Sequence, residues 1–412
     1  MPAPVERVEP PPEERPFLPY PTTGLRTPIS PQAQDRVQEG FYALNAGDLD
    51  AAGRIAAELL AGEEPPPPAA VLAAQVDLLL GRYADAVERL EPVVAEHPLY
   101  VAAQLVLGRA AERGGDLVRA YAAYGAVAAL APEALVRNAE LAPRVTEVLA
   151  ARLQDAVDRG RMEVAEATLA RMIAWFPEAD ATLGAARTFA VARGDRDSEL
   201  VAVREMARRA PEDRELAEDR AELELAVGDP GVALDIYQRF ADENPNDPEL
   251  ADRLSAAKFL WRVTQLPDRV QQVVATPELQ RGDLAVLLYW LVPRVRSSRA
   301  GAPRIASDIL DDPRRSEIAQ IVNLDLMPID QTLHRFYPDR VLTRREALAV
   351  VLRTLAHYDA GCRPAPESAA PVCSAAVACG LVAEEAACRP EESLPGSDAL
   401  ELLRRTAERL GS

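Results

Sequence analysis

Residues 99–132 read "LYVAAQLVLGRAAERGGDLVRAYAAYGAVAALAP", and this stretch decides the fold. Two helical runs flank a turn at Gly115, and Pro132 closes the second run. Equivalent turn glycines recur along the chain at intervals of 34 residues, with one interval of 45, at Gly47, Gly81, Gly115, Gly160, Gly194 and Gly228. Self-similarity at this period is typical of stacked helical hairpins. The sequence therefore predicts six helix–turn–helix units over residues 32–247.

Each unit contains the residues that a tight helical hairpin needs. Glycine tolerates the left-handed backbone that ends the first helix, and proline cannot continue the second. A small residue after the turn lets the two helices approach closely; it is Ala52, Ala86, Ala120, Ala165 and Ala233, with Glu199 as the exception. The closing prolines are Pro98, Pro132, Pro177, Pro211 and Pro245. The longer interval predicts an 11-residue insertion, around "EALVRNAELAPR", between the third and fourth units.

The unit at 99–132 resembles the tetratricopeptide repeat (TPR), which it matches at Gly108, Gly115, Ala120, Tyr124 and Pro132. The resemblance implies a right-handed superhelix whose first helices line a concave groove for protein partners. By this register the groove residues are Phe41, Gln75, Arg109, Glu112, Gln154, Glu215, Glu218 and Glu222. The far end of this groove is acidic. The alternative is that these glutamates only form a solvated face.

A different recurrence follows Pro245. Three stretches, at 279–291, 342–355 and 394–406, begin with Leu and place an acidic residue four positions later, at Asp283, Glu346 and Asp398. A carboxylate in the first turn of a helix complements the free N–H groups there. In the middle copy Thr343 and Glu346 have the spacing of a capping box. The sequence therefore predicts three helices with equivalent N-termini.

The middle copy resembles an S-layer homology (SLH) domain. The matching residues are Asp308 and Ile309, the aromatic-x-Pro of Phe336 and Pro338, and Thr343, Arg344 and Glu346. The third copy keeps Gly380, Leu381, Pro390 and Asp398, but Cys388 replaces the aromatic residue; the first keeps Arg281 and Asp283. The middle copy lacks the family's glycine after the first helix, where "NLDLMP" stands.

This second resemblance implies a small helical module over residues 248–412, built from three copies around a pseudo-threefold axis. The family holds cell-wall polysaccharide in the grooves between copies, so Arg344 and Glu346 would be the first candidates for that contact. The alternative is that Thr343, Arg344 and Glu346 only cap a helix.

Four cysteines lie close together, at Cys362, Cys373, Cys379 and Cys388. Their spacing lacks the C-x2-C knuckle of metal sites, and no histidine lies among them, so we expect no metal. An even number favours two disulfides, for which we choose the nearest-neighbour pairs Cys362–Cys373 and Cys379–Cys388. Disulfides indicate an oxidising compartment and so favour export. Four reduced thiols in a cytosolic protein are the alternative.

Composition limits the class of protein. The chain has a formal charge of −19 and lacks the cluster of basic residues that a nucleic-acid-binding protein needs. The longest strongly apolar run, Leu284–Val292, is too short to span a bilayer. Ten prolines in residues 1–31 predict an extended tether, and a disordered N-terminus is the alternative. No signal peptide is visible, so the protein is either cytosolic or a protein of the cell envelope, at the periplasm or cell surface, whose signal was removed.

We find no motif for catalysis and expect neither enzymatic activity nor a cofactor. The three histidines, His97, His334 and His357, follow no catalytic pattern. The sequence therefore predicts an all-α, two-part scaffold of the cell envelope, which binds protein partners through its groove and surface polysaccharide through residues 248–412. The alternatives are a cytosolic TPR adaptor and an accessory subunit of an envelope-assembly or polysaccharide-processing complex.

Overall fold

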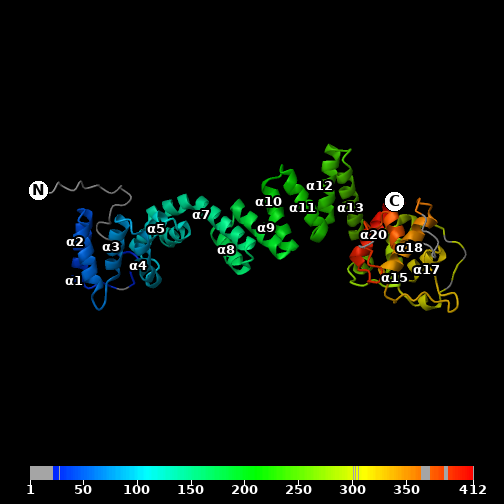
Figure 1. Cartoon of the computed structure of the whole chain (residues 1–412), viewed down its shortest axis with the longest axis horizontal. Helices are drawn as coiled ribbons and strands as arrows, with labels where there is room; N and C mark the ends of the chain where they lie inside the picture. The colour runs from blue at the N-terminus through cyan, green and yellow to red at the C-terminus, as the bar shows by residue number, and fades with distance from the viewer. Residues whose placement is uncertain are drawn as a thin grey trace. The chain divides into compact units, whose positions relative to one another are not determined.

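The computed structural model describes residues 22–411, except for 27, 300, 302, 305, 363–371 and 385–387. The described residues form helices joined by turns and contain no β-strand, which confirms the predicted all-α fold (Figure 1). Most of the predicted tether, residues 1–21, lies outside the described residues. Residues 28–30 have no regular structure and lead directly into the first helix.

From the first helix to the ninth, and again from the eleventh to the thirteenth, successive helices pack against each other. The helices as far as residue 264 are α1 (Pro31–Asn45), α2 (Leu49–Leu60), α3 (Pro67–Leu79), α4 (Tyr83–Glu96), α5 (Val101–Arg113), α6 (Leu117–Val127), α7 (Pro132–Asp158), α8 (Met162–Trp175), α9 (Asp180–Arg193), α10 (Arg196–Arg209), α11 (Arg214–Val227), α12 (Pro230–Glu243) and α13 (Pro248–Thr264). Each of the two packed stretches has the arrangement of a helical solenoid.

Shorter helices and longer loops make up the C-terminal region. Its helices are α14 (Asp268–Val274), α15 (Arg281–Leu291), α16 (Pro293–Ser297), the 3-10 helix η2 (Ser307–Ile309), α17 (Arg315–Asn323), α18 (Arg344–His357), α19 (Val372–Ala378) and α20 (Gly396–Arg409). The chain divides by its internal contacts into two compact units, Met1–Met206 and Ala207–Ser412. The boundaries at 31/32 and 247/248 stay predictions.

The hairpin turns require glycine in five of the six units. Gly47, Gly81, Gly115, Gly160 and Gly194 all have positive φ, between 68° and 85°. At Gly115 the next N–H, of Asp116, bonds to the Ala111 carbonyl at 2.8 Å, which is the closing bond of a Schellman motif.

The prediction of a left-handed turn at Gly228 is wrong, because the φ of this residue is −112°. Here the N–H of Asp229 bonds to a side chain instead of a helix carbonyl: the carboxylate of Glu224, fully buried, accepts it at 2.9 Å. Pro230 follows and restricts Asp229 to an extended conformation. The sixth turn is therefore closed by a side chain.

Close helix contact occurs where small residues were expected. The five alanines Ala52, Ala86, Ala120, Ala165 and Ala233 are all 0% exposed, whereas Glu199 is partly exposed. In the third unit, a Cβ on Gly108 would lie 2.5 Å from the ring of Tyr124. Gly108 therefore provides the space into which this buried tyrosine packs.

The 11-residue insertion lengthens one helix and adds no loop. It is absorbed into α7, which runs for 27 residues and contains Pro143. Because 11 residues make three turns with about 20° left over, both halves of the helix present the same face. Leu141 of the first half and Leu149 of the second are accordingly both buried in one core.

Helix α13 belongs to two cores of the second unit. Leu250, Leu254 and Ala257 pack with α11 and α12, whereas Phe259 and Val263 join the core of the C-terminal module. Ion pairing adds a contact, because Arg404 of α20 lies 3.2 Å from Asp252. The last hairpin and the C-terminal module are thus joined through one helix that packs against both.

Three equivalent leucines close a ring of backbone hydrogen bonds in the C-terminal module. The N–H of Leu279 donates to Leu394 O at 2.9 Å, that of Leu394 to Leu342 O at 3.3 Å, and that of Leu342 to Leu279 O at 2.9 Å. These are the first residues of the three recurring stretches. The recurrence in the sequence therefore corresponds to a cyclic arrangement of three segments.

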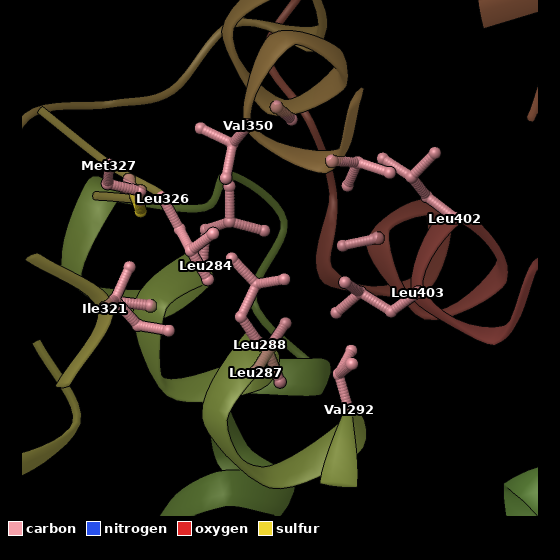
Figure 2. Close-up of a cluster of buried hydrophobic side chains, with 14 of the residues drawn as sticks. Leu284, Leu287, Leu288, Val292, Ile321, Leu326, Met327, Val350, Leu402 and Leu403 are labelled. Carbon is pink, nitrogen blue, oxygen red and sulfur yellow. The ribbon is translucent and has the colours of Figure 1, made fainter. Parts of the chain in front are cut away.

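The helices that follow the ring, α15, α18 and α20, meet in one apolar core. Figure 2 shows Leu287, Val350 and Leu402, which hold equivalent positions in the three helices, directed toward the same cluster. Leu288, Val351 and Leu403 form a second equivalent set in this core. Ile321 of α17 and the loop residues Leu326 and Met327 pack against α15.

Candidate binding surfaces

Two of the predicted groove residues are not accessible. Phe41 is 0% exposed and packs in the core of the first hairpins, and Gln75 is 2% exposed within α3. Almost every residue of α3 is buried, because apolar side chains occur all around it. The prediction that Phe41 and Gln75 contact a partner is therefore wrong.

Arg109 and Glu112 on α5 contribute to the fold. Arg109 pairs with Glu133 at the start of α7, and Glu112 accepts a hydrogen bond from Tyr124 Oη at 3.2 Å. Burial and the nearby Glu112 carboxylate raise the pKa of Tyr124. Gln154 on α7 is exposed and its amide donates to Asp158 at 2.8 Å. A role of these residues in partner binding stays a prediction.

The acidic residues Glu215, Glu218 and Glu222 lie along one face of α11, at i, i+3 and i+7. Glu215 is exposed, and Glu222 is 59% exposed. Arg253 of α13 reaches across to this face, 3.6 Å from Glu218 and 3.3 Å from Glu222. The sequence analysis missed Arg253, because it lies beyond the last repeat and has no place in the repeat register.

Arg253 also faces Tyr237 of α12. Burial, and then the Glu222 carboxylate, raises the pKa of Tyr237 to about 12. The tyrosine therefore stays neutral and leaves the charge of this surface to the glutamates and Arg253.

Charge is unevenly divided along the chain. Residues 248–412 contain 21 basic and 22 acidic side chains, which leaves −18 of the formal charge of −19 to residues 1–247. Within that part, residues 207–247 hold 5 basic and 12 acidic side chains. The acidity predicted for the far end of the groove is therefore concentrated at α11 and α12.

In the C-terminal module, the turn at Phe336 is held by a carboxylate far away in sequence. Asp308 accepts the N–H groups of Phe336 at 2.8 Å and of Tyr337 at 2.7 Å. Tyr337 has a φ of 58°, which is unfavourable for a residue with a side chain, and Phe336 is fully buried. Asp308 thus fixes the turn that leads through Pro338 into α18.

The predicted cap of α18 is confirmed. Thr343 Oγ1 accepts from Glu346 N at 3.3 Å, and Glu346 accepts from Thr343 N at 3.1 Å. The predicted core residues of this helix, Leu348, Val351, Leu352 and Leu355, are at most 4% exposed. The remaining oxygen of Glu346 pairs with Arg340 at 2.5 Å.

Arg344 lies beside a cavity between α18 and α20. The cavity has a volume of about 280 Å³, with Arg344 and Leu348 on one side and Asp398, Glu401 and Arg405 on the other. The guanidinium of Arg344 pairs with Asp398, and its Nε lies 3.9 Å from Glu392. The lining of the cavity therefore combines apolar side chains with paired charges. Whether it binds a ligand stays a prediction.

The residues equivalent to Arg344 in the other two copies are built into the fold. Arg281 is 9% exposed and donates to the carbonyls of Phe336 and Pro328, each at 2.9 Å. Burial, together with the nearby Arg340, lowers its pKa. A Cβ on Gly396 would lie 2.3 Å from the carbonyl oxygen of Val274. The three junctions between copies are therefore unequal in side-chain chemistry.

A network around Arg314 adds to the cap of the first copy, where Gln280 and Asp283 form a capping box on α15. Arg314 pairs with Asp283 at 2.9 Å, Asp312 at 2.9 Å and Asp339 at 2.6 Å. Burial raises the pKa of Asp312, but the hydrogen bonds from Arg314 outweigh it, so the net pKa is lowered. Sequence reasoning identified Asp283 and missed its partners, because they lie in loops without a repeat.

The cysteines form two disulfides, but the nearest-neighbour pairing is wrong. The pairs are Cys362–Cys379 and Cys373–Cys388, with Cα–Cα distances of 5.7 and 5.8 Å. The short helix α19 packs alongside α18, and Cys379 at its far end thereby meets Cys362, just beyond α18. Cys373 is then left facing Cys388. Helix packing, not sequence distance, decides the connectivity.

The third copy reproduces the turn geometry of the middle copy with different residues. Gly380 has a φ of 64°, and Asp325 adopts 60° at the equivalent helix end. Arg389 has a φ of 38° between Cys388 and Pro390, where the middle copy has Tyr337 between Phe336 and Pro338. Cys388 is 2% exposed, so it occupies the buried position of the aromatic residue.

Within the described part of the chain, no group of three or more His, Cys, Asp or Glu side chains could hold a metal ion. No described helix combines the length and apolar character needed to cross a membrane.

His97 is the C-cap of α4 and is buried, where its Nδ1 accepts the backbone N–H of Arg26 at 3.3 Å. His334 adopts a φ of 51°, and its carbonyl accepts the Ser307 N–H.

No protein-family model matches the chain. No curated protein matches it. Among solved structures, TPR proteins align with the chain. One from Thermus thermophilus is 22% identical, over 55% of this chain and 98% of its own, with a TM-score of 0.19. One from Parabacteroides merdae is 14% identical, over 60% and 90%, with a TM-score of 0.22. A third TPR domain is 15% identical, over 92% and 98%, with a TM-score of 0.29.

Proposed function

We propose that this chain is a non-enzymatic adaptor whose helical solenoid binds a basic segment of a partner protein at α11. The observation that carries the proposal is the acidic face of Glu215, Glu218 and Glu222, within a segment of strongly negative charge. Electrostatic complementarity steers association and selects partners by charge. Arg253, which crosses this face, orders the glutamates Glu218 and Glu222 and leaves Glu215 exposed.

The test is charge reversal on the proposed face. Glu215→Lys combined with Glu222→Lys should abolish retention of an arginine-rich peptide, and raising the salt concentration should weaken binding to the parent. The matched control reverses two exposed charges on the neighbouring helix α12, Asp235→Lys with Asp242→Lys. Equal loss of binding in both variants would indicate attraction to net charge alone and would refute a site at α11.

A second candidate function is association with cell-surface polysaccharide through the cavity beside Arg344. Its support is the cyclic packing of the three copies and the position of Arg344 and Leu348 at the cavity. The disulfides are consistent with an oxidising compartment outside the cytoplasm.

Arg344→Ala tests this second function, with Arg345→Ala as the control. Both residues begin α18, but the Arg345 side chain is 56% exposed and pairs with Glu391. Arg344→Ala should abolish sedimentation with purified cell-wall glycan, whereas Arg345→Ala should not. Because Arg344 pairs with Asp398, we expect the substitution to lower stability as well; folding is therefore checked by circular dichroism. Unchanged sedimentation of a folded Arg344→Ala variant would refute the role.

A further inference from the structure

The two disulfides differ in how well a thiol can reach them. Cys362 and Cys379 are 6% and 4% exposed, so both cysteines of that pair are buried. In the other pair Cys388 is 2% exposed, but Cys373 is partly exposed. Disulfides are opened by a thiolate that attacks an accessible sulfur, so access decides which one reacts first. Cys373 is the most accessible of the four.

The disulfide with the more exposed cysteine lies next to the turn that contacts the N-terminus of α18. Cys388 lines the cavity beside Arg344, and the turn after it carries the carbonyls of Pro390 and Glu392. These carbonyls accept the N–H of Arg345 at 3.1 Å and of Arg344 at 2.9 Å. The turn therefore caps the first residues of α18, whose N–H groups have no partner within their own helix.

The middle copy shows how such a turn is held without a disulfide. There the carbonyls of Pro338 and Arg340 accept the N–H of Gly282 at 2.8 Å and of Arg281 at 2.9 Å, which caps α15. That turn is anchored by hydrogen bonds to Asp308. In the third copy the covalent bond from Cys373 to Cys388 stands in the place of this anchor. The two caps are equivalent, but only one of them depends on a redox-active bond.

We propose that Cys373–Cys388 is a thiol–disulfide exchange site that controls the cap of α18 and the wall of the adjacent cavity. A thiolate of a dithiol reductant attacks Cys373 Sγ, the sulfur–sulfur bond breaks, and Cys388 leaves as a thiolate that takes a proton from solvent. The second thiol of the reductant then displaces Cys373 from the mixed disulfide. The protein disulfide gains two electrons, and the dithiol is oxidised to its own disulfide. The 388–392 turn loses its anchor.

The experiment follows the oxidised full chain during reduction by dithiothreitol. Alkylation and peptide mass spectrometry should show Cys373 and Cys388 modified before Cys362 and Cys379. At that stage, hydrogen exchange at the amides of Arg344 and Arg345 should become about five- to tenfold faster, as expected for the loss of one hydrogen bond each. The amides of Arg281 and Gly282 are the internal control and should keep their protection, because Asp308 still holds their cap.

Two double variants check the assignment. Cys373→Ser with Cys388→Ser should show fast exchange at Arg344 and Arg345 before any reductant is added. Cys362→Ser with Cys379→Ser should keep them protected until the dithiol is present. The proposal is overturned if Cys362–Cys379 opens first or simultaneously, if exchange at Arg344 and Arg345 does not change, or if Arg281 and Gly282 accelerate equally. If a variant fails to fold, the reduction of the parent decides alone.

Discussion

At the scale of single residues, backbone conformation explains where glycine is needed. Gly115 has a φ of 85°, and a Cβ there would meet no atom within 4 Å. The cost of a side chain at this turn is therefore conformational and does not come from a clash. Gly184, inside α9, also has open space around it but has ordinary helical backbone.

Alanine at these two glycines should have opposite effects. Gly115→Ala should lower the free energy of unfolding by about 1–2 kcal/mol, the cost of the left-handed conformation. Gly184→Ala should raise it by about 0.5–1 kcal/mol, because alanine favours a helix over glycine. Urea denaturation measures both. A stabilising Gly115→Ala would contradict the left-handed turn.

Asp325 is a non-glycine residue at a position that favours glycine. Its φ is 60°, and the next N–H, of Leu326, bonds to Ile321 O at 3.1 Å, as in a Schellman motif. Asp325→Gly should therefore raise stability by about 0.5–1 kcal/mol. The substitution also removes the exposed ion pair between Asp325 and Arg304. The variant Arg304→Ala measures the contribution of that ion pair to stability separately. A fall in stability greater than that of Arg304→Ala would refute the strain.

Acid should weaken the second unit through carboxylates whose pKa is lowered on folding. The net pKa of Asp312 is lowered, because hydrogen bonds from Arg314 outweigh its burial. The unfolded chain then binds protons more tightly than the folded one, so this stability is present above about pH 4 and is lost below it. Asp312→Asn should flatten the dependence of the urea midpoint between pH 5 and 3, and the exposed neighbour Asp311→Asn should not. Equal slopes in all three proteins would contradict this.

At the scale of elements, α7 shows that an insertion can preserve a solenoid. Its 11 extra residues add three turns and return the helix to almost the same face. A loop of this length would have left backbone groups to be satisfied by water. The helix satisfies them internally and adds Ala134 and Leu141 to the core.

Deletions in α7 should depend on helical phase more than on length. Removing residues 133–143 keeps the phase, so Val145, Leu149 and Leu153 stay buried and cooperative unfolding should persist. Removing the nine residues 133–141 turns the remainder about half a turn, which exposes these side chains and should cost several kcal/mol. Thermal melts by circular dichroism compare the two. Greater stability of the nine-residue deletion would refute the phase argument.

At the scale of the whole molecule, α13 connects the last hairpin to the C-terminal module. Its Phe259 and Val263 are buried only because the module covers them. A chain that ends at residue 264 exposes both and should self-associate in analytical ultracentrifugation. Phe259→Lys with Val263→Lys in the same truncated chain should restore the monomer. If the truncated chain without the lysine substitutions is monomeric, exposure of Phe259 and Val263 does not cause self-association and the prediction is wrong.

The sequence predicted most of the repeat structure, because periodicity records local requirements. The turn glycines, the buried alanines and the Thr343 cap each depend on residues close by. The predictions were wrong or incomplete where contacts between segments distant in the sequence determine the structure. Contacts between helices and loops decide the burial of Phe41 and Gln75, the pairing of Cys373 with Cys388, and the partners of Arg314. The conformation of the sixth turn, at Gly228, was not predicted, because the buried side chain of Glu224 accepts the hydrogen bond that a helix carbonyl accepts in the other turns.

The ring of Leu279, Leu342 and Leu394 also determines the order in which the protein is completed. During synthesis, a hairpin of the solenoid can pack as soon as its neighbour leaves the ribosome. The ring cannot close in that way, since two of its three bonds involve Leu394. The first two copies must therefore wait, with apolar faces uncovered, until the last copy is made. A nascent chain is most exposed to aggregation and chaperone capture during this interval.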